Sequence, residues 1–222
     1  MIEEFSCILA IPYFNSVSDS RNNEYLICLQ NNINNPLIDK ILLLCETSIS
    51  LPDSIKSEKI IVRVINHRPT YQDAFKITKY YARKLFNDKR KIIIIANSDI
   101  IFTQNSITAI NHRLDSNTVL ALSRWNIKIS QDLQLFEELH NHRDSQDSWA
   151  FLNTIKNGNF SFEMGIPGCD NRLAYELHKI KYRVINPAKS IVTKHLHLSD
   201  FRTYTYANQK ISPPYLLVDL IE

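Results

Sequence analysis

Three polar residues, Asn97, Ser98 and Asp99, interrupt the most hydrophobic segment of the chain, KIIIIANSDIIF at residues 91–102. The isoleucine run before them is typical of a strand that is buried on both faces. In open α/β sheets, ligands bind beyond the carboxyl ends of the strands. A carboxylate there suits a hard divalent cation that is shared with phosphate groups. The segment therefore predicts a metal and phosphate site, with a simple Asx-turn at the strand end as the alternative.

Two histidines, His195 and His197, could complete such a metal site. They follow an apolar stretch in NPAKSIVTKHLH and lie two residues apart, so both side chains face the same way on a strand. A neutral imidazole is a common metal ligand. Arg202 follows and could bind two diphosphate oxygens at once. The alternative is a polar C-terminal strand with a salt-bridged arginine.

A third group with possible chemistry is Asp170, in GIPGCDNRLAYEL, at the start of a predicted helix over residues 171–179. A carboxylate at this place can act as a general base. The helix dipole is expected to hold it ionised. An aspartate at a helix start is also a common N-cap, and the two roles do not exclude each other.

The elements that must position these groups alternate between strands and helices. Apolar runs predict strands at residues 6–11, 40–45, 59–65, 91–102, 119–124, 182–185 and 191–197. Helical spacing predicts helices at residues 22–32, 72–86, 106–113 and 171–179. Strands that are apolar throughout indicate a parallel sheet covered by helices. We therefore expect one α/β domain over residues 1–222, with residues 126–168 as irregular loops laid over the sheet.

The first predicted strand ends at Pro12, Tyr13, Phe14 and Asn15. In a parallel sheet this end lies at the same edge as the end of the isoleucine strand. Aromatic rings and an amide at this edge suit a flat base, beside the carboxylate expected to hold metal and phosphate.

Composition excludes several classes of protein. The 222 residues are 44% hydrophobic and 22% charged, which argues against disorder, and a net charge of +3 without a basic cluster argues against nucleic acid as a partner. Three glycines cannot supply a glycine-rich phosphate loop. The four cysteines form no CxxC pair, so we expect buried free thiols in a reducing compartment. No apolar run has the length of a membrane span, and MIEEFS does not resemble a signal peptide, so we expect a cytoplasmic protein.

Several of these motifs carry a resemblance. IIIIANSDI is similar to the DxD motif of nucleotide-sugar glycosyltransferases of the GT-A type, with Asn97 in place of the first aspartate. GIPGCDN looks like the Gly-x-Glu-Asp segment of inverting members, which makes Asp170 the catalytic base, with Asn171 in place of the second acid. Family members often carry a histidine that completes the metal site, which HLH matches. Small viral and bacterial family-2-like members look most similar.

The resemblance assigns further residues. Asp147 and Trp149 in DSQDSWAF resemble an acceptor-binding segment, in which an indole stacks on a sugar ring. The alternative is a loop tryptophan that packs against the sheet. Arg68, Tyr71 and Asp73 in HRPTYQD become candidates for contacting the base, ribose or phosphate of the donor. The alternative for HRPTYQD is a helix start with a capping box.

The resemblance implies a GT-A fold, a Rossmann-like α/β/α sandwich with a mainly parallel central sheet. It implies Mn²⁺ or Mg²⁺, a nucleoside-diphosphate sugar donor, a glycan or glycoconjugate acceptor, inversion at the anomeric carbon and a role in polysaccharide biosynthesis. Two other classes remain open. Both acidic motifs have exchanged a carboxylate for an amide, as expected of a catalytically silent nucleotide-sugar or glycan-binding domain. A nucleotidyltransferase would need a basic, glycine-rich loop near the first strand, and PYFNSVSDSRNNE has no glycine.

Overall fold

The computed structural model describes residues 4–87, 90–129, 134–198 and 210–222. Its central feature is a seven-stranded sheet in the order β10-β6-β9-β4-β1-β2-β3. All neighbouring strands pair in parallel except β9, which is antiparallel to β4 and β6. The strands are β1 (Phe5–Pro12), β2 (Lys40–Cys45), β3 (Ile60–Val64), β4 (Arg90–Ala96), β6 (Thr118–Leu122), β9 (Ser148–Leu152) and β10 (Arg183–Ile185).

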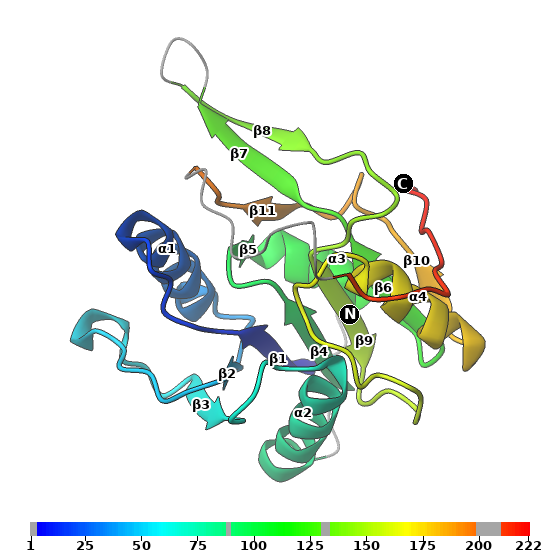
Figure 1. Cartoon of the computed structure of the whole chain (residues 1–222), viewed down its shortest axis with the longest axis horizontal. Coiled ribbons are helices and arrows are strands. Elements are labelled where there is room, and N and C mark those ends of the chain that lie inside the picture. The colour runs from blue at the N-terminus through cyan, green and yellow to red at the C-terminus, as the bar shows by residue number, and fades with distance from the viewer. Residues whose placement is uncertain (1–3, 88–89, 130–133, 199–209) are drawn as a thin grey trace.

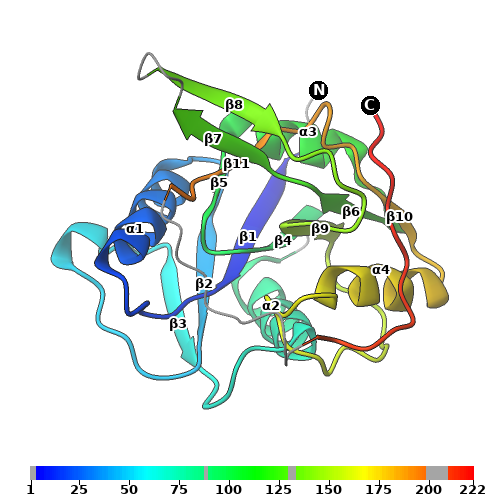
Figure 2. The same cartoon turned by 45° about the horizontal axis from the view of Figure 1, so that its top comes forward.

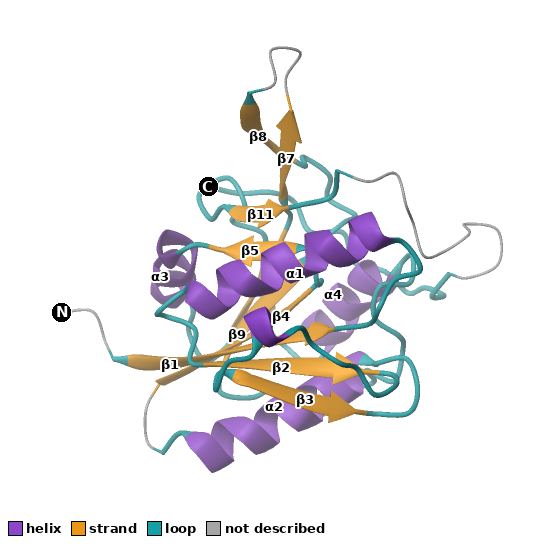
Figure 3. Ribbon diagram, turned by 90° about the vertical axis from the view of Figure 1, so that its left-hand side faces the viewer, coloured by secondary structure: helices purple, strands orange, loops and turns teal. Residues whose placement is uncertain are grey.

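Helices cover both faces of this sheet, as Figure 3 shows for α1 and α3 on one side and α2 on the other. Residues of α1 and α3 belong to one hydrophobic cluster, and residues of α2 and α4 belong to the second. The helices are α1 (Asp19–Asn34), α2 (Tyr71–Leu85), α3 (Gln104–Arg113) and α4 (Cys169–Lys179), with a short 3₁₀ helix at Asp53–Ile55. This arrangement confirms the expected α/β/α sandwich with a mainly parallel central sheet.

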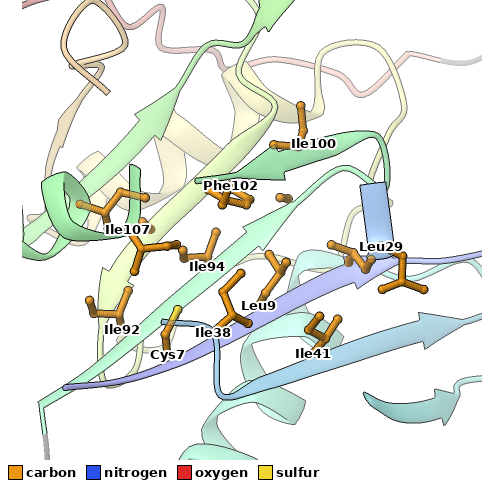
Figure 4. Packing of buried hydrophobic residues seen from close by; sticks show 14 of the residues in the cluster. Cys7, Leu9, Leu29, Ile38, Ile41, Ile92, Ile94, Ile100, Phe102 and Ile107 are labelled. Carbon is orange, nitrogen blue, oxygen red and sulfur yellow. The ribbon is translucent and has the colours of Figure 1, made fainter. Parts of the chain in front are cut away.

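The alternation of side chains along the strands explains why the sheet is apolar on both faces. In β1, Cys7 and Leu9 pack toward α1 and α3, whereas Ile8 and Ala10 pack toward α2 and α4. The isoleucine run of β4 divides in the same way. Figure 4 shows the first of these clusters, with residues of β1, β2, β4 and α1 in contact. The buried strands therefore form a rigid platform for the loops at their carboxyl ends.

A second, smaller sheet has the order β5-β11-β7-β8. Its strands are β5 (Ile100–Phe102), β7 (Trp125–Ile129), β8 (Leu135–Leu139) and β11 (Thr193–His195). The β7–β8 hairpin projects from the body of the molecule (Figure 1). The short β11 pairs with both β5 and β7, so it brings the segment after β4 next to the segment after β6.

The prediction of irregular loops at residues 126–168 is wrong, because this region contains most of β7 and all of β8 and β9. β9 is a central strand of the main sheet, paired with β4 on one side and β6 on the other. Its five residues carry too short a pattern to stand out, and two long-range pairings hold it. The other predicted elements are present with ends shifted by a few residues, and the predicted strand at residues 91–102 divides into β4 and β5.

The C-terminal segment packs against the rest of the fold, beside α4 (Figure 2). The backbone N–H of Leu216 donates to the carbonyl of Asn171 at 2.9 Å. Gly168, just before α4, has a φ of 86°, which favours glycine, and a Cβ there would lie 2.9 Å from the hydroxyl oxygen of Tyr215. This glycine lets the C-terminal segment approach the start of α4, where Asp170 lies.

The four cysteines are buried and free, as expected. Within the described part of the chain, no helix combines the length and the apolar character needed to cross a membrane.

Candidate functional site

A cavity of about 640 Å³ opens at the carboxyl ends of β1, β2 and β4. This volume is in the range of sites that bind drug-sized ligands and cofactors. Among the residues predicted to bind a donor, its lining includes Pro12, Tyr13, Asn15, Arg68, Asn97, Ser98 and Asp99. The structure thus brings together the ends of the first strand and of the isoleucine strand, as the sequence predicts.

Asp99 lies in the turn between β4 and β5, where the chain leaves the main sheet for the smaller one. Its side chain lines the cavity and is only 7% exposed. Oδ2 accepts a hydrogen bond from Nη2 of Arg21 and lies 3.2 Å from Nε2 of His195. Burial alone would raise the pKa of Asp99, but His195 and Arg21 outweigh it and hold the pKa well below its usual range. The carboxylate therefore stays charged.

Asp99, His195 and His197 form a group whose potential ligand atoms all lie within 4.8 Å of one another. Burial, followed by the positive charge of Arg21, lowers the pKa of His197. A neutral imidazole is the form that binds metal. The three residues predicted as metal ligands are therefore close enough to share one ion.

The hydrogen bonds of His195 support a cation at this place. Its Nδ1 lies 2.9 Å from Oδ1 of Asn126, which also accepts from Nε of Arg124, so Nδ1 carries the proton. In a neutral ring, Nε2 then carries a lone pair that faces Oδ2 of Asp99. Nε2 and Oδ2 are both hydrogen-bond acceptors, so this contact is favourable only if a proton or a cation lies between them. Oδ1 of Asp99 is buried and has no hydrogen-bond partner among the described residues. Both features fit a metal whose histidine ligand is oriented by a second residue.

A hydrogen-bond network connects this group to Asp147, in the segment DSQDSWAF, through Asn126 and Arg124. Nη1 of Arg124 donates to both carboxylate oxygens of Asp147, at 3.1 and 3.0 Å. Nδ2 of Asn97 donates to Oδ1 of Asp147 at 3.1 Å, and the backbone N–H of Asn97 donates to the carbonyl of Asp147. The network arises because β9 is antiparallel, so its amino end meets the carboxyl ends of β4 and β6.

Asp170 is the second residue of α4. Oη of Tyr71 donates to its Oδ1 at 3.3 Å, and Sγ of Cys169 lies 3.5 Å from the same oxygen. Burial, together with the negative charge of Asp147, raises the pKa of Asp170 to about 7. The expectation that the helix dipole holds this group ionised is therefore wrong, because burial and the neighbouring carboxylate outweigh the dipole. A carboxylate with a pKa near neutrality is well suited to accept a proton and release it again.

Several predicted residues occupy places that do not fit their predicted roles. Trp149 is 2% exposed in the core of the sheet, so no indole face is available to stack on a sugar. Asp147 is buried and already paired with Arg124 through both oxygens, which leaves it poorly placed to take sugar hydroxyls. Asp73 closes a capping box with Thr70, the alternative that the sequence offered.

Tyr71 is buried and contacts Asp170, so it lies beside the candidate base and not along the cavity. Arg68 lines the cavity, and its Nε donates to the carbonyl of Met164 at 3.0 Å. Arg202 lies outside the described residues.

Sequence reasoning missed Arg21, Glu24, Arg124 and Asn126. A signal for the first two exists, because Arg21 and Glu24 share the helix face of Tyr25 and Cys28 by 3.6-residue spacing. Charged residues on an otherwise apolar face need buried partners. Arg124 and Asn126 lacked such a signal, because their role depends on β11 pairing with β7.

Neither a family model nor a curated protein sequence matches the chain. Among solved structures, the mannosyltransferase PcManGT from Pyrobaculum calidifontis, in complex with GDP-Man and Mn²⁺, is 12% identical with a TM-score of 0.49. The match covers 85% of this chain and 56% of that one, so the chain spans little more than half the length of the mannosyltransferase. A 4-diphosphocytidyl-2C-methyl-D-erythritol synthase from Anaerococcus prevotii is 12% identical with a TM-score of 0.37, over 67% of this chain and 70% of that one.

Proposed function

We propose that this chain is a metal-dependent glycosyltransferase that moves a sugar from a nucleoside-diphosphate sugar to a hydroxyl of a glycan acceptor, with inversion, in polysaccharide biosynthesis. The observation that carries the proposal is the group of Asp99, His195 and His197, because Asp99 lines the cavity at the carboxyl ends of β1 and β4 and both histidines lie close to it. Two imidazoles beside one carboxylate favour Mn²⁺ over Mg²⁺.

The cavity lining suggests how the donor lies. Tyr13 and Asn15 follow β1 and offer an aromatic ring and an amide to the base and ribose, and Pro12 at the end of β1 lines the cavity with them. The diphosphate then points toward Asn97 and Asp99 at the end of β4.

Arg68 and Ser98 also line the cavity, but only Arg68 is free to contact the donor through its side chain. Arg68 lines the same cavity, beside Met164 and Gly165, where its guanidinium can contact a phosphate. The hydroxyl of Ser98 donates to the carbonyl of Pro12, so Ser98 fixes the lining and does not bind the donor through its side chain. Arg202 stays a candidate for the diphosphate.

In the reaction, Asp170 accepts the proton of the acceptor hydroxyl as that oxygen attacks the anomeric carbon. The hydroxyl of Tyr71 donates to the same carboxylate and orients it. A bound divalent cation would supply positive charge to the departing nucleoside diphosphate. We do not assign the acceptor to Trp149 or Asp147, since both side chains are buried.

The decisive test is metal-dependent nucleotide binding in Asp99→Asn. Titration calorimetry with GDP and UDP, with and without Mn²⁺, should show that Mn²⁺ strengthens binding to the wild type and not to the variant. Asp53→Asn is the matched control, because Asp53 has an exposed carboxylate in the 3₁₀ helix and does not line the cavity. If Mn²⁺ strengthened nucleotide binding to Asp99→Asn as much as to the wild type, Asp99 would not be a metal ligand.

A second candidate function is a nucleotide-sugar or glycan-binding domain without catalysis. Arg21 already neutralises Asp99, which is the observation that favours it. A turnover assay with a panel of nucleoside-diphosphate sugars separates the two functions. Donor binding without transfer or hydrolysis would favour the silent domain.

A further inference from the structure

Arg21, at the start of α1, is 6% exposed and is held on several sides. Its Nη2 donates to Oδ2 of Asp99, and its Nη1 donates to Oε2 of Glu24 at 2.6 Å and to the carbonyl of Leu196 at 3.3 Å. Its guanidinium also lies 4.6 Å from the ring centre of Tyr25. These contacts fix a permanent positive charge at one place in the cavity lining.

That charge lies where it opposes a metal ion. Oδ2 of Asp99 is bonded to Arg21 and also faces Nε2 of His195, a potential ligand. A divalent cation held by Asp99 and the histidines would therefore lie next to the guanidinium. At such short range, in a buried place, two like charges repel strongly. Arg21 also occupies one lone pair of the carboxylate in the proposed metal-binding group.

We propose that Arg21 competes with the divalent cation for Asp99, so that the metal binds weakly alone and tightly only together with a nucleoside diphosphate. This inference rests on the proposed metal and donor site. The phosphates add negative charge between the two cations and accept hydrogen bonds from the guanidinium, which offsets the repulsion. Metal and nucleotide binding are then coupled, and each strengthens the other by the same factor.

The alternative is that Arg21 only stabilises the buried Asp99, and binding of Mn²⁺ alone distinguishes the two roles. Mn²⁺ is titrated into the wild type, Arg21→Gln and Arg21→Lys, with and without GDP or UDP. Electron paramagnetic resonance measures the free Mn²⁺, which gives the affinity of each protein for the ion. We expect Arg21→Gln to bind Mn²⁺ alone about tenfold more tightly than the wild type, or better, because the competing charge is gone. Arg21→Lys keeps the charge and should bind Mn²⁺ alone about as weakly as the wild type.

The coupling gives a second measurement. In the wild type, nucleotide should tighten Mn²⁺ binding about tenfold or more, and in Arg21→Gln this factor should be smaller. Binding of Mn²⁺ alone to Arg21→Gln that is equal to or weaker than wild-type binding would overturn the proposal and leave Arg21 a structural partner of Asp99.

Folding is checked by thermal unfolding, because Arg21→Gln leaves Glu24 without its guanidinium. The double variant Arg21→Gln, Glu24→Gln removes that carboxylate as well and should still bind Mn²⁺ alone more tightly than the wild type. Sugar transfer is assayed separately. Tighter Mn²⁺ binding by Arg21→Gln without any sugar transfer would contradict the proposed transferase activity and support the role of Arg21. Sugar transfer in the presence of a chelator, with no Mn²⁺ bound to any variant, would support the transferase activity and contradict the role of Arg21.

Discussion

Replacing Asp170 with asparagine should make the protein more stable at alkaline pH while abolishing sugar transfer. Folding raises the pKa of this carboxyl from its usual value of 3.8 to about 7. Such a difference corresponds to a cost of about 4 kcal/mol for keeping the group ionised in the folded state. Asparagine is neutral and has nearly the same shape, so it avoids that cost.

The effect has a defined pH window. Between the unfolded and the folded pKa, the folded state binds the extra proton, so wild-type stability falls as pH rises. The slope is about 1.4 kcal/mol per pH unit, and the penalty is complete above pH 7. From pH 5 to pH 8 the advantage of Asp170→Asn over the wild type should therefore grow by roughly 2 to 3 kcal/mol.

The assay is denaturant unfolding of the wild type and the variant at several pH values in this range. Asp53→Asn is again the matched control, because its carboxylate is exposed and does not line the cavity. A difference in stability between Asp170→Asn and the wild type that does not change with pH would refute the raised pKa of Asp170. Full transfer activity in the same variant would refute its role as the base, and retained nucleotide binding is expected in either case.

Three further predictions test other parts of the site. Asn126→Ala removes the acceptor that orients His195, so Mn²⁺ binding in the presence of GDP should weaken about tenfold, as measured by calorimetry; unchanged affinity would contradict the orienting role. Tyr71→Phe removes a hydrogen bond that favours the charged form of Asp170, so the pKa of Asp170 should rise further and kcat/KM at pH 6 should fall about threefold; an unshifted pH profile would count against this contact. Asp73→Ala should cost about 1 kcal/mol of stability in denaturant unfolding and leave nucleotide affinity unchanged, because Asp73 caps α2; weaker nucleotide binding would restore its predicted donor role.

The central sheet could be predicted because its parallel strands are apolar on both faces. β2 and β4 read as continuous hydrophobic runs, and this is a local property of the sequence. β9 could not be predicted in this way. It has five residues, begins at a buried serine and follows Gln146 and Asp147, which are also buried. Its position depends on pairing with strands that are distant in sequence, and no local periodicity records that pairing.

In the candidate site, too, local sequence patterns predicted some residues, whereas others depend on long-range pairing. Asp99, His195 and His197 could be grouped from the sequence because strand ends at one edge of a sheet must meet. The partners of these residues could not be grouped, because Arg21 reaches Asp99 from a helix and Asn126 reaches His195 across the smaller sheet. Trp149 shows the opposite error, since a motif resemblance suggested an exposed ring where the pairing of β9 with β4 and β6 buries it.

The break in the isoleucine run has a structural cause as well as a chemical one. The chain must leave the main sheet after Ala96 and begin β5 in the smaller sheet at Ile100, and the turn between them cannot stay in either ladder. Pairing of β5 with β11 then sets His195 opposite Ile100, one residue after Asp99. The carboxylate is thereby buried between two sheets, where an isolated charge would be costly. The ion pair with Arg21 offsets that cost in the structure, and a metal ion would have to replace part of the contact between Arg21 and Asp99. Burial thus does not argue against a cation at Asp99, but it makes the strength of cation binding depend on the guanidinium beside it.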